Sequence, residues 1–451
     1  MRHIPAPTRP RRLLSLTLGL LLMAGCASSD DGGDPKPSGD AGTGDAGTGD
    51  AGTGVPDGGG GPGPSGCLNE AFLASLGERR LLVGAQMQDD TAASAPFDIH
   101  ALYIAGGLFD SPNVCTSCTS GCSASGTSCQ GGGCAWWGCW QDTTLPPGDY
   151  VRGFVSRAQG RGQLPLITYY QQLLGSGLGE GEQQLSALND VSFMRRYLAD
   201  WRFVVQQVGD AQALLHLEPD LWGYVQFFHG DARGVPAQVA SANATDCAGM
   251  ENNAAGLQRC MIAMARKYAP NAKVGVHASP WATRLDVYLN THASFDVAGE
   301  ARKVADFLLQ AGAGDADFVV VEASDRDAGF YESQGEHAWW DATNATRPNF
   351  HQAFAWAKAV SERMNKPNLW WQLPVGNMDL PDTNMHWRDN RVDYFFSHPD
   401  EVAAAHAVGF SFGAGEGRQT TPETDNGHLV GRVRAYAESG GQAPCIPTLA
   451  P

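Results

Sequence analysis

The feature that most constrains the fold is a regular alternation of short apolar runs with longer amphipathic segments. Eight mostly apolar runs, of six or seven residues each, recur between residues 81 and 413: 81–86, 100–106, 164–170, 213–218, 272–278, 317–322, 368–373 and 408–413. Nearly continuous apolar strands that alternate with amphipathic helices are typical of a parallel sheet covered by helices. Eight such units predict a closed (β/α)₈ barrel of the TIM type.

The segments between these runs are long enough for helices on the outside of a barrel. The clearest are 186–209, 253–269, 295–312, 349–365 and, after the last run, 426–439. The first connection, 87–99, is short for a full helix, so an open doubly wound sheet is the alternative fold. After the second run, residues 108–148 form a long cysteine-rich insertion.

The first 25 residues have the pattern of a leader rather than of a folded element. Four arginines precede an apolar run from Leu13 to Met23, which is typical of a secretory signal and too short to span a bilayer. The following "LMAGC" resembles the lipobox of bacterial lipoproteins. That resemblance implies export, lipidation of Cys26, and anchoring at the outer membrane or cell surface by the lipid alone. The alternative is an ordinary signal peptide with a chance cysteine.

Residues 26–66 are predicted to be a disordered tether between the anchor and a folded domain. They repeat "DAGTG" three times, from Asp40 to Gly54, and contain no aromatic residue. The folded domain is expected over residues 67–451, as a monomer. The whole chain has a formal charge of −17, which argues against nucleic acid and against polyanionic substrates.

The chain has 11 cysteines, and lipidation of Cys26 leaves an even number in an oxidising compartment. We expect Cys247 to pair with Cys260, and Cys67 with Cys445, because closing a barrel brings the chain ends together. Six more lie in the insertion and are expected to pair among themselves: Cys115, Cys118, Cys122, Cys129, Cys134 and Cys139. The alternative for these six is a metal site, but the spacing lacks the two separated C-x2-C knuckles of a zinc ribbon.

Polar side chains stand where the predicted strands end, which is where the active sites of such barrels lie. These side chains are Gln86, Tyr169 or Tyr170, Glu218, His277, Glu322 and Gln372. The two glutamates end strands four and six. Because side chains alternate along a strand, Glu218 should share a face with His216, and both glutamates are expected to point toward the barrel mouth. Alternatively, one or both only pair with an arginine such as Arg326.

Tryptophans are frequent, at 12, and many follow predicted strands. A flat aromatic ring can stack on the apolar face of a sugar ring, and a loop held by disulfides would fix it at low entropic cost. The expected sugar-binding tryptophans are Trp136, Trp137, Trp140, Trp222, Trp281 and Trp387. Because three of these lie in the insertion, the insertion is expected to form one wall of the binding site. The alternative is that the tryptophans fill the core.

Two carboxyl groups that flank a sugar are what glycoside hydrolysis requires. We assign Glu218 as the proton donor and Glu322 as the nucleophile or base, with the two roles open to exchange. Burial beside Trp222 would raise the pKa of Glu218, as a proton donor needs. The substrate contacts are expected from Tyr170, Asp220, His277 and Gln372.

At this level residues 67–451 resemble the (β/α)₈ glycoside hydrolases. "LEPD" (217–220) is similar to a strand end of family 6 cellulases, although the surrounding pattern differs. In the cellulase-like clan the nucleophile ends strand seven, where this chain has Gln372. Acids on strands four and six resemble instead the α-galactosidase arrangement, which normally uses aspartate. No specific family is assigned, because fold-level analogy is a weak warrant for function.

The expected function is therefore that of an exported, lipid-anchored glycoside hydrolase acting on a polysaccharide. The alternatives are a non-catalytic surface glycan-binding protein and a peptidoglycan-cleaving enzyme, which the cell-envelope location allows. No cofactor or metal is expected, although the loops 323–329 and 379–384 contain oxygen ligands of the kind that Ca²⁺ takes.

Overall fold

The computed structural model describes residues 67–108, 145–415 and 417–444, the backbone of three short strands between 118 and 128, and Trp136. Its centre is a closed barrel of eight parallel strands in the order β1-β2-β6-β7-β8-β9-β10-β11, with β1 also paired to β11. The strands are β1 (Leu82–Gln86), β2 (Ile99–Ile104), β6 (Leu164–Tyr169), β7 (Leu214–Leu217), β8 (Lys273–Ala278), β9 (Phe318–Glu322), β10 (Asn368–Leu373) and β11 (Ala407–Phe412). All eight predicted strands and the closed barrel are confirmed.

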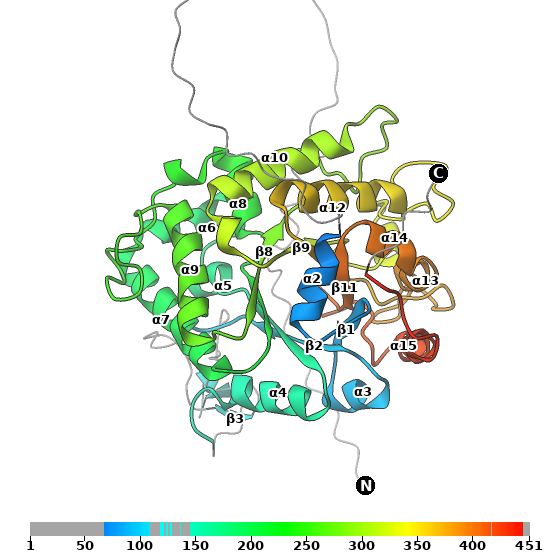
Figure 1. Cartoon of the computed structure of the whole chain (residues 1–451), viewed down its shortest axis with the longest axis horizontal. Helices are drawn as coiled ribbons and strands as arrows, with labels where there is room; N and C mark the ends of the chain where they lie inside the picture. Colours follow the sequence, from blue (N-terminus) through cyan, green and yellow to red (C-terminus); the bar gives the residue numbers. More distant parts are fainter. Residues whose placement is uncertain are drawn as a thin grey trace, which may run out of the picture. The chain divides into compact units, whose positions relative to one another are not determined.

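Helices surround the barrel (Figure 1). They are α2 (Leu68–Ser75), α3 (Asp89–Ser94), α4 (Asp149–Gly160), α5 (Gln172–Ser176), α6 (Glu182–Leu185), α7 (Val191–Val208), α8 (Leu221–His229), α9 (Ala254–Tyr268), α10 (Val297–Gln310), α11 (Ala328–Ser333), α12 (Phe350–Met364), α13 (Arg391–Ser397), α14 (Pro399–Ala404) and α15 (His428–Glu438). The five helices predicted most clearly correspond to α7, α9, α10, α12 and α15. The short first connection contains only the six-residue helix α3, and the barrel is nevertheless closed.

The longest helix, α7, shows how the sequence builds this outer layer. Asp190 caps its first turn by accepting hydrogen bonds from the backbone N–H groups of Ser192 and Phe193. Its apolar side chains recur at helical spacing and face the barrel. Trp201 is fully buried, and its Nε1 donates to the carbonyl of Met261 in α9 at 3.0 Å. The helix is thereby fixed against both the barrel and its neighbour.

The N-terminal end of the barrel is covered by α2 (Figure 1). Phe72 packs edge-on against Phe318, the first residue of β9, with ring centroids 5.5 Å apart. The Asn69 amide donates to the carbonyls of Ala407 and Pro444, so the beginning and end of the domain lie side by side. This juxtaposition agrees with the predicted bridge from Cys67 to Cys445.

One predicted disulfide is confirmed, between Cys247 and Cys260, with Cα atoms 5.2 Å apart. Cys67 is disulfide-bonded. Its predicted partner Cys445, the side chains of the six insertion cysteines, Cys26, and the leader and tether lie outside the described residues, so those expectations stay predictions. Among the helices that the structure describes, none is long and apolar enough to cross a membrane.

Candidate active site

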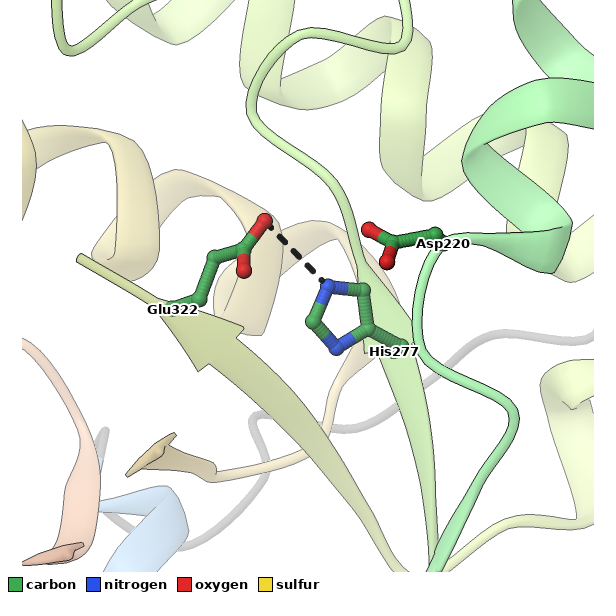
Figure 2. Close-up of side chains that lie close together, drawn as sticks. All are labelled: Asp220, His277 and Glu322. Carbon is green, nitrogen blue, oxygen red and sulfur yellow. Dashed lines mark ion pairs between the residues drawn. The ribbon is translucent and has the colours of Figure 1, made fainter. Parts of the chain in front are cut away.

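Three side chains from neighbouring strands converge at the C-terminal end of the barrel. Asp220 follows β7, His277 lies on β8, and Glu322 ends β9 (Figure 2). One nitrogen or oxygen atom from each lies within 4.8 Å of the other two. In the part of the chain that the structure describes, this is the one group of three or more such residues able to hold a metal ion.

Glu322 is the predicted site residue whose position agrees best with its predicted role. Its side chain is 14% exposed, and its Oε1 lies 3.6 Å from Nε2 of His277, which is itself almost fully buried. Within the described residues the Glu322 carboxylate accepts no direct hydrogen bond. It is therefore free to interact with a bound molecule.

Asp220 reaches the same point through a strained turn. Glu218 and Asp220 both have positive φ, 41° and 68°, on either side of Pro219. Non-glycine residues in this region cost roughly 1–3 kcal/mol each and cluster at functional sites. Asp220 also occupies the N-cap position of α8, yet its side chain caps no backbone N–H there. The carboxyl group is turned toward His277 and Glu322 instead (Figure 2).

The environment of Asp220 favours its protonated form. Burial is the main cause that raises its pKa well above the usual range, and the negative charges of Glu322, Glu180 and Asp325 raise it further. A like charge nearby and a low dielectric both penalise the ionised carboxyl. Asp220 is thus suited to hold a proton beside a partly exposed glutamate.

Further acidic side chains surround this pair. Burial raises the pKa of Asp286 to about 6, and the charge of Glu322 adds to that shift. Asp325 accepts a hydrogen bond from the Tyr331 hydroxyl at 2.6 Å and pairs with Arg326. The barrel mouth is therefore acidic, which agrees with the predicted exclusion of polyanionic substrates.

The inner wall beneath the acids is aromatic. The ring of Trp371 lies 4.6 Å from that of His216 and 5.7 Å from that of Tyr103, and Tyr103 packs edge-on against Tyr170. Burial raises the pKa of Tyr103, and the negative charges of Asp220 and Glu322 raise it further. The predicted substrate residue Tyr170 is thus close to the site. Sequence reasoning missed Trp371 and Tyr103.

The prediction that Glu218 points toward the barrel mouth is wrong. Its side chain is fully buried and faces the helical layer, where Oε1 accepts hydrogen bonds from the Tyr197 hydroxyl of α7 at 2.7 Å and from two backbone N–H groups, of Gln171 and Gln172. The alternation of side chains fails here because β7 ends at Leu217 and the next residue has positive φ. Burial raises the pKa of Glu218 to about 8, against the effect of these hydrogen bonds.

Beside Glu218 lies a second buried acid, Asp200 of α7. It accepts hydrogen bonds from the Tyr169 hydroxyl at 2.9 Å, from the Gln171 amide and from Nε1 of Trp136 at 3.0 Å. Trp136 is fully buried, so the prediction that it stacks on a sugar is wrong. Its hydrogen bond to Asp200 instead links this residue of the insertion to α7. Trp137 and Trp140 lie outside the described residues.

The other predicted substrate residues fall into two groups. Trp222 and Trp387 are almost fully buried, and Trp387 donates to the carbonyl of Arg418, so neither presents a stacking face. Gln372 is also buried, because a break in the pairing of β10 with β11 and a positive φ turn it aside. Trp281 is half-buried against Tyr224 of α8, beside the mouth.

In the two loops considered for Ca²⁺, Asp382 and Asp327 make internal contacts, whereas Asp379 is exposed. Asp382 pairs with Arg388. Asp327 accepts hydrogen bonds from the backbone N–H groups of Gly376 and Thr420, although burial raises its pKa to about 7. These contacts join the loops that follow β9, β10 and β11.

A cavity of about 630 Å³ lies elsewhere, between α8, α10 and the loop after β8, and contains none of the mouth acids.

Comparisons with known proteins give no family. No family model matches the sequence, and no curated protein matches it. Among solved structures, it is similar to the endo-1,4-β-D-mannanase of Thermotoga petrophila RKU-1, with 11% identity, 80% of this chain and 99% of the other covered, and a TM-score of 0.45. A modular endo-β-1,4-mannanase of Cellulomonas fimi, of glycoside hydrolase family 26, is 11% identical, with 82% of this chain and 73% of the other covered and a TM-score of 0.44. The β-1,4-mannanase of Aplysia kurodai is 12% identical, with 82% of this chain and 96% of the other covered and a TM-score of 0.40. At such low similarity, substrate and mechanism must be inferred from the site itself.

Proposed function

We propose that the chain is a glycoside hydrolase in which Asp220 is the proton donor and Glu322 the nucleophile or base. The observation that carries this proposal is the convergence of two carboxyl groups in contrasting environments at the C-terminal end of the barrel. Asp220 takes the proton-donor role that the sequence analysis assigned to Glu218, because Glu218 is fully buried and hydrogen-bonded to Tyr197. Tyr170, Trp281 and His277 remain as proposed neighbours of the substrate.

The short distance between the two acids favours a retaining mechanism. An Asp220 oxygen and a Glu322 oxygen lie within 4.8 Å of each other. Carboxyl groups of retaining enzymes lie about 5–5.5 Å apart, whereas inverting enzymes leave roughly 6.5–9.5 Å for a water molecule.

In the first step the Asp220 carboxyl gives its proton to the glycosidic oxygen while a Glu322 oxygen attacks the anomeric carbon. The bond to the leaving sugar breaks, and a glycosyl ester forms. The ionised Asp220 then takes a proton from water, whose oxygen displaces Glu322.

We further propose, from the leader sequence, that the enzyme is exported and held on the outer membrane or cell surface by a lipid on Cys26. A polysaccharide outside the cell is then its partner. Mass spectrometry of the mature N-terminus should find a diacylglyceryl group on this cysteine. An unmodified N-terminus beyond residue 26 would contradict the anchor.

A panel of neutral polysaccharides, including β-1,4-mannan and β-1,4-glucan, together with peptidoglycan sacculi, tests the activity. The wild-type chain should release reducing ends from at least one of them. Glu322→Gln should not, whereas Asp379→Asn, a control at an exposed loop position, should act like the wild type. Binding of a glycan with no release by any variant would point to a binding protein. Release from sacculi alone would point to the peptidoglycan-cleaving alternative.

A metal-dependent hydrolase is the second candidate function, because one histidine nitrogen and two carboxylate oxygens are a donor set that divalent metals accept. Elemental analysis of the purified protein separates the two. Activity that persists in a chelator, without stoichiometric metal, supports the glycosidase. Loss of activity that is restored by one metal would favour the second candidate.

A further inference from the structure

We infer that Thr168, His216 and His277 form a chain of hydrogen bonds, each donated toward the next residue, and that His277 presents an N–H to Glu322. His216 is then a positioning residue that acts on Glu322 through His277. The catalytic consequence rests on the proposed function, but the chain of hydrogen bonds does not.

The four side chains come from four consecutive strands, β6 to β9. The Thr168 hydroxyl lies 3.2 Å from Nδ1 of His216, and Nε2 of His216 lies 3.1 Å from Nδ1 of His277. Nε2 of His277 then lies 3.6 Å from Oε1 of Glu322. Thr168, His216 and His277 are each at most 1% exposed, so water cannot easily substitute for any partner.

The direction follows from counting protons. A single hydrogen can lie between the facing nitrogens of His216 and His277. If His277 carried its proton on Nδ1, its Nε2 lone pair would face the Glu322 carboxylate, and this buried nitrogen would have no donor.

The opposite tautomer leaves no lone pair facing the Glu322 carboxylate and gives a partner to both nitrogens of His216 and to Nδ1 of His277. With the proton on Nε2, His277 donates toward Glu322, and its Nδ1 accepts from Nε2–H of His216. Nδ1 of His216 then accepts from the Thr168 hydroxyl.

Packing fixes the two rings in this arrangement. They lie nearly parallel, at 22°, and Trp371 packs edge-on against both. The N–H that they present opposes the effect of the acids around Glu322, which are Asp220, Asp286 and Asp325. The N–H of His277 therefore faces the carboxylate that the proposed mechanism uses as nucleophile or base.

The tautomers can be read directly by NMR. In the full chain labelled with ¹⁵N-histidine, long-range ¹H–¹⁵N correlations at neutral pH should show both His216 and His277 carrying the proton on Nε2 and not on Nδ1. A His277→Gln variant assigns the signals. An Nδ1–H tautomer or an imidazolium at His277 would overturn the inference. This readout needs no substrate, so it remains decisive if the proposed glycosidase activity fails.

Kinetics of two His216 variants test the positioning role. His216→Phe fills the space but donates nothing, and should lower kcat by about tenfold with little change in KM. His216→Gln can place an amide N–H where Nε2 stands, and should restore most of kcat. Equal losses in both variants, or none in His216→Phe, would contradict the positioning role while leaving the proposed function intact.

Discussion

Two pairs of carboxyl groups lie on either side of the turn that ends β7, and their surroundings differ. Asp200 and Glu218 form the wall pair, between the barrel and α7, and accept hydrogen bonds from hydroxyl, amide, indole and backbone donors. Asp220 and Glu322 form the mouth pair and accept none from the described residues. The wall pair joins strands, helix and insertion, whereas the mouth pair keeps its oxygens available for a ligand. Accepted hydrogen bonds, rather than position next to a strand end, distinguish the structural acids from the proposed catalytic ones, although Oε2 of Glu218 has no partner among the described residues.

The largest expected effect comes from removing the proposed nucleophile. Glu322→Ala should lower turnover by at least about a thousandfold, because no carboxylate remains to attack the anomeric carbon. Azide should restore part of the turnover on an activated aryl glycoside, by entering the space left by the carboxylate and giving a glycosyl azide of inverted configuration. The matched variant Asp379→Asn should be indifferent to azide. A Glu322→Ala enzyme with native turnover would remove the distinction between the two pairs.

The next effect is on stability and concerns the wall pair. Asp200→Leu leaves the buried donors of Trp136 and Gln171 without their acceptor, and leaves the Tyr169 hydroxyl only its longer hydrogen bond to the Tyr197 carbonyl. Each such group costs about 1–3 kcal/mol, so the free energy of unfolding should fall by roughly 3 kcal/mol or more. Asp200→Asn keeps one acceptor oxygen and should lose less. Denaturant titration measures both. Equal stability of Asp200→Leu and wild type would show that the network contributes little.

A further effect is expected in the pH dependence of stability. The pKa of Glu218 rises from 4.5 to about 8 on burial, so its stabilising contribution is complete below about pH 4.5 and is lost as the pH rises through 8. Asp98, Asp286 and Asp327 are shifted in the same direction. The free energy of unfolding should therefore fall between about pH 5 and pH 9, by up to ~1.4 kcal/mol per pH unit for each such group.

Glu218→Gln isolates one part of that slope. Glutamine cannot ionise, so the variant should lose less stability than the wild type between about pH 5 and pH 9. Identical slopes for the two proteins would mean that burial does not raise the pKa of Glu218.

The smallest effect concerns the aromatic wall of the mouth. Trp371→Phe keeps an apolar ring beside His216 but removes contact area, and should change kcat or KM by only a few fold. Steady-state kinetics on the cleaved polysaccharide measure this. A loss as large as that of Glu322→Ala would mean that Trp371 has a larger role than lining the site.

The barrel could be predicted from the sequence because its signal is periodic and repeated eight times. The position of Glu322 followed from the same pattern, since β9 remains extended to its last residue. Glu218 could not be placed in this way, because a positive φ inside Leu-Glu-Pro-Asp ends the alternation one residue early. The adjacent Asp220, assigned only a substrate contact, reaches the mouth through that turn.

Tertiary packing determines which way the aromatic side chains face, and the sequence does not show this. Strand alternation makes Trp370 and Trp371 face opposite sides but does not say which faces inward. Trp370 packs against Phe354 of α12, and Trp371 packs inside the barrel. Trp136 was expected on a surface because it lies in a cysteine-rich loop, yet the buried carboxylate of Asp200 provides an acceptor for its indole N–H.

The central claim is that Asp220, and not its neighbour Glu218, is the proton donor. Parallel kinetics of Asp220→Asn and Glu218→Gln test it most directly, on one substrate with a poor leaving group and on one that needs no proton. Asp220→Asn should lose turnover by about a hundredfold or more on the first and much less on the second. Glu218→Gln should stay within about tenfold of the wild type on both. The reverse pattern, with the selective loss in Glu218→Gln, would contradict the assignment.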